Sequence, residues 1–403
     1  MNLFRLCMSY LRRNLVTTTL NVLLLALGVA TIALLLIVAR ELHERLLRDA
    51  QGIDLVVGAK GSPLQLVLAG VFHADTPTGN IPLDEIVRLR ADARVAQVIP
   101  LSLGDNLLGF RIVGTEVDLI AHYGASLESG NVWGAPFEAV VGAEVAAKTG
   151  LKVGQTFAGV HGLGAGGGEH AATPYRVVGI LRPAGRVIDR LVLTDLASVW
   201  EAHEHQENPS TNAAHDNAKH DEAREVTMAL VKYQTPLATV SLPREINART
   251  QLQAASPAFE AARLFNVFGL AMDVLRGFAI VLIAAAVLSM FASLYRAIDQ
   301  RKYDVAIMRM LGASRGQVVG ALLLESLILA VCGVLLGLLL GHFVASRMAM
   351  VTPGADPLAG AAWRLLPEEG WIVLLALASG ILAALIPAWR AYRLDVAAVL
   401  AKG

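Results

Sequence analysis

Four long apolar stretches mark the chain, and a long segment of mixed polarity separates the first from the other three. A bilayer core of about 30 Å is crossed by about 20 apolar residues in a helix, and each stretch is long enough. The pattern therefore predicts four membrane-spanning helices. They cover Leu15–Ala39, about Val274–Tyr295, about Val318–Ala345 and Trp371–Tyr392.

The first stretch is interpreted as a retained span rather than a cleaved signal peptide. Its apolar part exceeds the roughly 7–15 residues of a signal peptide. The sequence "RELHERLL" follows it, where a small-x-small cleavage site would be needed. The polar residues after it, "ELHERLLRDAQG", continue the helical pattern, so the helix is expected to extend beyond the membrane.

The segment between the first two spans alternates short β-like runs with turn signals, which favours an α+β domain with two lobes. Helices are expected at "PLDEIVRLRAD" and at "GAEVAAKTG", and a further one over Arg244–Leu270, leading into the second span. The predicted fold class is a membrane α-helical protein whose four transmembrane helices carry a large α+β extracytoplasmic domain between helices 1 and 2. Strands are expected at "IDLVVGA", "VAQVIPLSL", "LLGFRIVGTE", "EAVVGAEVA", "YRVVGILRP", "RLVLTDL" and "TMALVKY".

Lys and Arg in the short loops fix the expected orientation, because cytoplasmic loops carry an excess of them. The N-terminal segment, the loop after the second span and the tail are rich in these residues, whereas the loop before the fourth span is not. Both termini are therefore expected in the cytoplasm, and the α+β domain outside it.

Composition supports the membrane assignment. Hydrophobic residues make up 55% of the 403 residues and charged residues 17%, against about 25% charged residues in soluble proteins. The formal net charge is zero, so no overall field attracts nucleic acid. The two cysteines, Cys7 and Cys332, lie far apart, and neither a disulfide nor a cysteine zinc site is expected.

The loop after the second span, "RAIDQRKYDVAIMRMLGASRGQV", predicts a short amphipathic helix. Gly312 lies where that helix would end, and Ser314 lies where the next would begin. On the pattern alone, this helix could be an anchor in the membrane interface.

This loop and the following span resemble the MacB/LolCE/FtsX-type permeases of the mechanotransmitting ABC superfamily, in which such a loop forms a coupling helix. Their pattern is a basic residue, an acid three positions later, apolar residues, a second basic residue and a Leu-Gly-Ala-Ser/Thr tetrad. The family more often has Glu where this chain has Asp304. The resemblance assigns ATPase coupling to Arg301, Asp304, Ile307, Arg309, Leu311, Gly312 and Ala313.

Other parts of the chain are similar to the same family. The N-terminal "FRLCMSYLRRNLVTTTLNVLLLALGVA" resembles its first helix and span, and "IPAWRAYRLDVAAVLAKG" resembles its closing tail. The expected division is 1–45 for the N-terminal helix and first span, 46–265 for the extracytoplasmic domain, 266–295 for the stalk and second span, 296–317 for the coupling helix, 318–345 for the third span, 346–370 for the outer loop, and 371–403 for the fourth span and tail.

The resemblance implies the permease subunit of an ABC transporter in a bacterial inner membrane, which is not itself an enzyme. The chain has no Gly-Lys dipeptide and so no P-loop, and ATP and Mg are expected in a separate cytoplasmic ATPase dimer. Further expected partners are a second permease copy or paralogue, membrane lipids and a periplasmic protein. The work would be done outside the membrane on a lipoprotein, lipid, peptide or drug.

Ionisable and small residues inside the third span are further candidates. Glu325 would be costly in lipid, and we favour a structural or coupling role over a path for protons or ions. Gly333, Gly337 and Gly341 form a small-x-x-x-small stripe that suits close helix contact, within the bundle or at a dimer seam.

The segment 201–225 is rich in histidine and carboxylate, and two interpretations stay open. It is a solvated polar loop, or it is a tether that captures zinc through His203, His205, His215 and His220. No pair has the i, i+4 spacing of a helical zinc site.

Two alternative functions therefore accompany the transporter hypothesis. One is an FtsX-like regulator of an external hydrolase, and the other is a component of a zinc or metal transport system that uses this segment.

Overall fold

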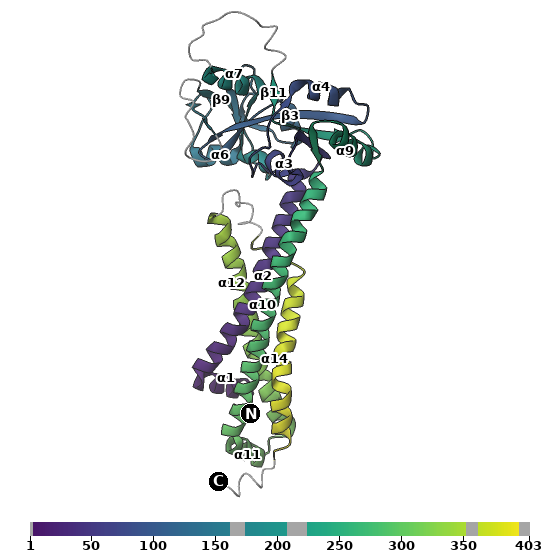
Figure 1. Cartoon of the computed structure of the whole chain (residues 1–403). Helices are drawn as coiled ribbons and strands as arrows, with labels where there is room; N and C mark the ends of the chain where they lie inside the picture. The colour runs from purple at the N-terminus through teal and green to yellow at the C-terminus, as the bar shows by residue number, and fades with distance from the viewer. Residues whose placement is uncertain (1–2, 162–173, 208–223, 352–361, 395–403) are drawn as a thin grey trace, which may run out of the picture. The chain divides into compact units, whose positions relative to one another are not determined.

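The computed structural model describes residues 3–161, 174–207, 224–351 and 362–394. The chain forms two compact units (Figure 1): Met1–Leu42 with Val267–Gly403, and His43–Asn266. Two long helices, α2 (Leu15–Ala50) and α10 (Pro257–Gln300), contribute residues to both units.

The first unit is a helical bundle. Within the described residues, four helices are long and apolar enough to cross a membrane: α2, α10, α12 (Arg315–Val351) and α14 (Glu369–Tyr392). Two short helices join them, α1 (Leu3–Arg13) before α2 and α11 (Lys302–Met310) between α10 and α12. The prediction of four spans with a domain inserted after the first is confirmed.

Glycines bring the helices of the bundle close together. A Cβ built on Gly380 of α14 would lie 2.7 Å from Ala330 Cβ of α12, and one on Gly28 of α2 would lie 2.6 Å from Ile283 Cγ1 of α10. Both distances are too short for a side chain, so each glycine permits a contact between neighbouring helices that alanine would prevent.

The second unit is built on one continuous mixed sheet. Eleven strands are described in it, and nine of them follow the order β13-β1-β12-β3-β4-β10-β6-β9-β5, while β7 pairs with β9 and β8 with β3. Most neighbours are antiparallel, but β10 runs parallel to β4, and β6 runs parallel to β9. The bounds are β1 Leu55–Ala59, β3 Val95–Leu107, β4 Phe110–Thr115, β5 Leu127–Gly130, β6 Glu138–Val141, β7 Thr156–Phe157, β8 Val160–His161, β9 Tyr175–Leu181, β10 Leu191–Asp195, β12 Met228–Tyr233 and β13 Leu252–Ala255; β2 Ile81–Pro82 and β11 Glu225–Val226 form a separate pair.

Alternate residues of the central strands enter two different cores, as the period of two requires. In β1, Val56 packs with one core and Leu55 and Val57 with the other. The first core also contains residues of α3 (Pro63–Gly70) and α5 (Asp118–His122); the second contains residues of α4 (Leu83–Ala91), α7 (Leu196–Glu207) and α9 (Ala238–Arg249). Helices thus cover both faces of the sheet, which explains why its strands are apolar on both sides.

All seven predicted strands are present, and so are the expected helices at α4 and at α6 (Ala143–Thr149), which ends at Gly150 with a left-handed φ of 73°. The helix expected over Arg244–Leu270 is wrong in its middle. Strand β13 interrupts it, because residues 252–255 pair with β1 at the edge of the sheet. Helix α10 then begins at Pro257, and proline suits the first turn of a helix, where its missing N–H is not needed.

The outer ends of α2 and α10 are in contact inside the second unit. The ring of His43 lies 4.8 Å from the ring of Phe265. The end of α2 is also bound to the domain, because Asp49 Oδ1 accepts a hydrogen bond from the Val187 amide at 2.9 Å. Arg186 Nη2 donates a second bond to Gln51 Oε1 at 2.9 Å. The end of the first spanning helix is therefore fixed to the domain by specific hydrogen bonds.

Candidate functional site

The candidate site surrounds α11, the helix expected to couple to an ATPase. Arg301 separates α10 from α11 with a non-helical φ of −107° and ψ of 10°. After α11, Gly312 adopts a φ of 98°, which favours glycine and turns the chain. Ser314 and Gln317 then cap α12 reciprocally: Gln317 N donates to Ser314 Oγ at 3.2 Å, and Ser314 N donates to Gln317 Oε1 at 2.9 Å. The sequence predicted both boundaries.

Helix α11 has an inner and an outer face. Val305 and Ala306 are buried, and Val305 packs in the apolar core at this end of the bundle. By contrast, Tyr303, Met310 and Leu311 leave 53%, 61% and 83% of their surface exposed. An apolar surface of this kind on a short polar helix is typical of a contact with another protein or with the membrane interface.

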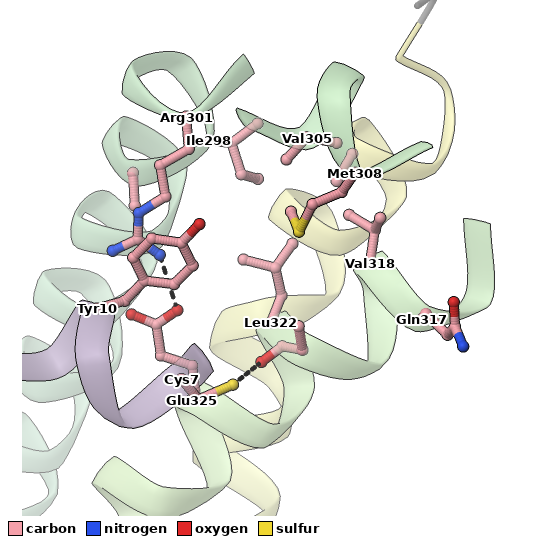
Figure 2. A pocket seen from close by; sticks show the side chains of 13 residues that line it. Cys7, Tyr10, Ile298, Arg301, Val305, Met308, Gln317, Val318, Leu322 and Glu325 are labelled. Carbon is pink, nitrogen blue, oxygen red and sulfur yellow. Dashed lines mark hydrogen bonds and ion pairs between the residues drawn. The ribbon is translucent and has the colours of Figure 1, made fainter. Parts of the chain in front are cut away.

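Arg301 links α11 to the third span through an ion pair. Its Nη1 donates to Glu325 Oε2 of α12 at 3.1 Å, and the two side chains are only 13% and 9% exposed. The guanidinium carbon also lies 3.7 Å from the ring centroid of Tyr10 on α1. Figure 2 shows the three side chains converging from three helices. The bond joins two residues that the sequence had singled out separately.

A pocket lies beside this ion pair (Figure 2). Cys7 forms part of its wall, and its Sγ donates to the Ala321 carbonyl at 3.2 Å, which ties α1 to α12 a second time. The other walls are mainly apolar side chains of the end of α10, of α11 and of the start of α12. The pocket is thus lined by the elements that would have to move relative to one another if α11 transmitted force. It is lined by Cys7, Tyr10, Ala297, Ile298, Arg301, Val305, Met308, Gln317, Val318, Ala321, Leu322, Glu325 and Ala391.

The remaining coupling candidates lie around this centre. Asp304 is exposed. The pKa of Tyr10 is raised mainly by the burial of Tyr10 and next by the negative charge of Asp304. Ile307 is half-buried, and Arg309 Nη1 donates to the Leu394 carbonyl at 3.4 Å. Ala313 N donates to the Met308 carbonyl at 3.0 Å, closing the turn at the end of α11.

A further ion-pair group fixes the end of α14 beside α10. Asp299 Oδ1 lies 2.6 Å from Lys302 Nζ and 3.5 Å from Arg390 Nη2. The guanidinium of Arg390 also lies 4.3 Å from the ring centroid of Tyr295. The α10–α11 corner is therefore connected to both α12 and α14.

The glycine stripe of the third span lies against α2 within the bundle. A Cβ on Gly333 would lie 2.8 Å from Leu25 Cδ2, and one on Gly337 would lie 2.7 Å from both Ala26 O and Val29 Cβ. A Cβ on Gly341 would lie 3.0 Å from the carbonyl oxygen one helical turn farther along α2. The three glycines thus let the backbones of α12 and α2 approach closely over two turns.

The histidine-rich segment is only partly described. Helix α7 includes His203 and His205 and ends at Glu207, so the loop expected from residue 201 begins later. His215 and His220 lie outside the described residues. Among the residues described, no group of three or more His, Cys, Asp or Glu could hold a metal ion.

The extracytoplasmic domain contains a second set of shielded ionisable groups. Arg111 Nη2 donates to the Asp75 carbonyl at 2.8 Å. His73 is partly buried in a left-handed conformation with φ 51°, and its Nδ1 is shielded from solvent without a hydrogen-bond partner in the described structure. Burial, and then the positive charge of Arg111, lowers the pKa of His73 to about 3. The ring is therefore neutral in the folded domain at ordinary pH.

Sequence reasoning missed Tyr10 and Cys7. Both lie on α1, whose alternation of apolar and basic residues marks a helix with one buried face. The missing information was the position of α1 against α12, because nothing in the local pattern says which helix covers Arg301.

Protein-family comparison gives two matches that follow one another along the chain. A MacB-like periplasmic core domain matches residues 18–270, and an FtsX-like permease C-terminal domain matches residues 276–396. No curated protein matches the chain in sequence.

Two solved structures are similar to part of the chain. The periplasmic region of MacB from Actinobacillus actinomycetemcomitans is 10% identical with a TM-score of 0.35, covering 56% of this chain and 98% of that one. The extracellular domain of the noncanonic ABC-type transporter YknZ from Gram-positive bacteria is 11% identical with a TM-score of 0.29, covering 51% of this chain and 99% of that one.

Proposed function

The chain belongs to the MacB/FtsX-type ABC transporter permeases, and on that premise we propose that it converts the work of a separate cytoplasmic ATPase into movement of its extracytoplasmic domain. Permeases of this type work with cytoplasmic ABC ATPases. The chain itself carries no P-loop. It would be the membrane subunit of the machine, present as two copies or beside a paralogue, in an inner membrane with both termini in the cytoplasm.

The observation that carries this proposal is the two-faced helix α11. Its outer face exposes the apolar side chains Met310 and Leu311 next to Arg309. A partner protein could bury these side chains, which gives a favourable contact of about 25 cal/mol per Å² of apolar surface. Its inner face is bonded into the bundle by the Arg301–Glu325 ion pair. A push on α11 would therefore reach α12 through a buried contact rather than a flexible loop.

The contacts of α2 and α10 support the second step of the proposed transmission, from the helical bundle to the extracytoplasmic domain. Both helices continue from the bundle unit into the domain unit without a break in helical structure. The domain holds the end of α2 through Asp49 and Arg186. The cargo would be a lipoprotein, lipid, peptide or drug handled at the outer face.

The test captures the full chain from membranes and measures both the ABC ATPase that accompanies it and ATP hydrolysis. Leu311→Asp places a charge on the outer face of α11 and should abolish capture of the ATPase. Leu108→Asp is the matched control, because Leu108 is 79% exposed in the other unit. It should capture the ATPase as the wild type does.

Two results would overturn the proposal: complexes that never contain an ATPase, or equal capture by the Leu311→Asp variant. If the ATPase is captured but its activity changes only when an external hydrolase is added, the regulatory alternative replaces transport.

A further inference from the structure

A buried contact between a histidine and a glutamate lies at the opposite end of α12 from Glu325. His342 Nε2 of α12 is 3.3 Å from Oε2 of Glu369, the first residue of α14, and the two side chains are 5% and 4% exposed. The other ring nitrogen, Nδ1, is hydrogen-bonded to the carbonyl of Ala362. The ring also stacks on Trp363, with centroids 6.1 Å apart. His342 therefore joins α12 to the segment 362–368 and to α14.

The contact with Ala362 fixes the position of one proton. A carbonyl oxygen only accepts hydrogen bonds, so Nδ1 of His342 must carry the hydrogen. If the ring is neutral, Nε2 then has a lone pair directed at its surroundings. The nearest polar atom is the carboxyl oxygen of Glu369, which is also an acceptor when ionised.

The carboxyl group of Glu369 needs a proton or a cation beside it. Both of its oxygens are shielded from solvent and have no hydrogen-bond donor among the residues described. An isolated buried carboxylate costs several kcal/mol, by the order of magnitude known for buried ions. A neutral ring facing an ionised carboxylate is therefore the unfavourable state. One proton shared by the pair, on Nε2 or on Glu369, removes the conflict and leaves the pair with no net charge.

The surrounding charges do not supply this compensation. On α2, Arg40 lies 3.5 Å from the exposed Glu368, and Glu41 is buried. The segment 362–368 also contains Arg364, and α12 contains Arg347. In the described part of the chain, neither His342 nor Glu369 forms an ion pair with any of these side chains.

We propose that His342 and Glu369 form a proton-binding site at the outer end of the bundle, and that the bound proton holds the segment 362–368 against α12. The ligand is H⁺ itself, bound without a redox step. This site differs from the coupling centre at Arg301, so it does not depend on the proposed ATPase contact. Loss of the proton would set the lone pair of Nε2 against the carboxylate and favour separation of the segment from α12.

The first test locates the proton by nuclear magnetic resonance. The full chain, in lipid nanodiscs, carries ¹⁵N in its histidine rings and ¹³C in its glutamate carboxyl groups. His342→Gln and Glu369→Gln identify the two signals by their disappearance. The expected wild type has Nδ1 protonated, together with either a protonated Nε2 or a protonated Glu369. In Glu369→Gln the ring becomes neutral with only Nδ1 protonated. A wild-type ring protonated only at Nε2, or a neutral ring beside an ionised Glu369, overturns the proposal.

The second test asks whether the proton or the carboxylate holds the segment. Amide hydrogen exchange of 362–368 is compared between variants. Glu369→Gln should keep the wild-type protection, because the amide can donate to Nε2 without a shared proton. His342→Ala should accelerate exchange about tenfold or more, since it leaves polar groups unsatisfied. Glu368→Gln, the exposed neighbour, is the control and should change nothing. Equal acceleration in Glu369→Gln and His342→Ala would show that the carboxylate charge is required and overturn the proposal.

Discussion

Arg301 and Glu325 are 24 positions apart in the sequence, yet Arg301 Nη1 donates to Glu325 Oε2 at 3.1 Å in the buried part of the bundle. The pair connects the residue that precedes α11 to the first part of α12. A buried ion pair contributes modestly to stability when intact, but removal of one partner leaves an uncompensated charge. The pair is therefore better suited to fixing a geometry than to stabilising the fold.

The first prediction concerns the removal of one partner. Glu325→Ala should lower the stability of the bundle by about 3–5 kcal/mol, because the guanidinium of Arg301 stays buried without its acceptor. The double variant Arg301→Met/Glu325→Leu should recover most of this loss. Thermal unfolding of the full chain in nanodiscs measures both. A double variant as unstable as Glu325→Ala would show that the loss does not come from the unpaired charge of Arg301.

Tyr10 is predicted to act through its ring. Tyr10→Phe keeps the face that the Arg301 guanidinium covers at 3.7 Å and should unfold like the wild type. Tyr10→Leu keeps apolar volume but loses the cation–π contact and should cost about 0.5–2 kcal/mol. Thermal unfolding is again the measurement. If Tyr10→Phe and Tyr10→Leu are equally stable, the aromatic face of Tyr10 contributes nothing to stability.

The contact between α12 and α2 gives a prediction with an internal control. Gly337→Ala places a methyl group 2.7 Å from Val29 Cβ and should destabilise the bundle by about 1–3 kcal/mol. Gly320→Ala, on the same helix, meets no atom within 4 Å and should be neutral or slightly stabilising, because alanine is the better helix former. A bundle that tolerates both equally would not have the close seam described.

His73 predicts that acid weakens the extracytoplasmic domain. Its pKa is lowered to about 3 in the folded chain, against about 6.5 in an unfolded one. Between these values the unfolded state binds more protons, so stability falls as pH drops from about 6.5 to about 3. The slope stays below about 1.4 kcal/mol per pH unit, because a single histidine exchanges at most one proton between the two states.

His73→Asn is the variant for this measurement, since asparagine tolerates a positive φ. It should flatten the pH dependence of unfolding in the acid range. An unchanged slope in the variant would assign the acid sensitivity to other groups.

The zinc hypothesis also makes a definite prediction. Replacement of His203, His205, His215 and His220 by Ala should abolish zinc binding by the full chain in calorimetric titration, because imidazole is an ordinary zinc ligand. The wild type should bind more weakly as pH falls toward 6, since protonated histidine cannot ligate. Equal zinc affinity in the two proteins would remove the metal transport alternative.

The sequence was sufficient for features that depend on local pattern. The seven β-like runs became strands because period-two alternation exposes one set of side chains to each face of a sheet. Gly312 and Ser314 marked helix boundaries because a left-handed turn and a cap have chemical requirements that few residues meet. The helix predicted over residues 250–256 is absent, because strand pairing with β1 outweighs the helical periodicity of this segment.

The contacts within the candidate site could not be predicted from the sequence alone. Arg301 and Glu325 were both singled out, but only the fold shows that they bond. Tyr10 carried no signal of its own, since its role depends on where α1 packs. The contact between His342 and Glu369 could not be predicted either, because the two residues belong to different spans.

The glycine stripe restricts where the bundle can part. Helix α12 packs so closely against α2 that there is no room for side chains at Gly333, Gly337 and Gly341. Helices α12 and α2 are thus expected to move together as one rigid unit. Only 22% of the most apolar part of α10 is buried, against 39–44% in the other three spans. Helix α10 therefore keeps the largest share of its apolar surface outside the bundle, where lipid or another protein can cover it.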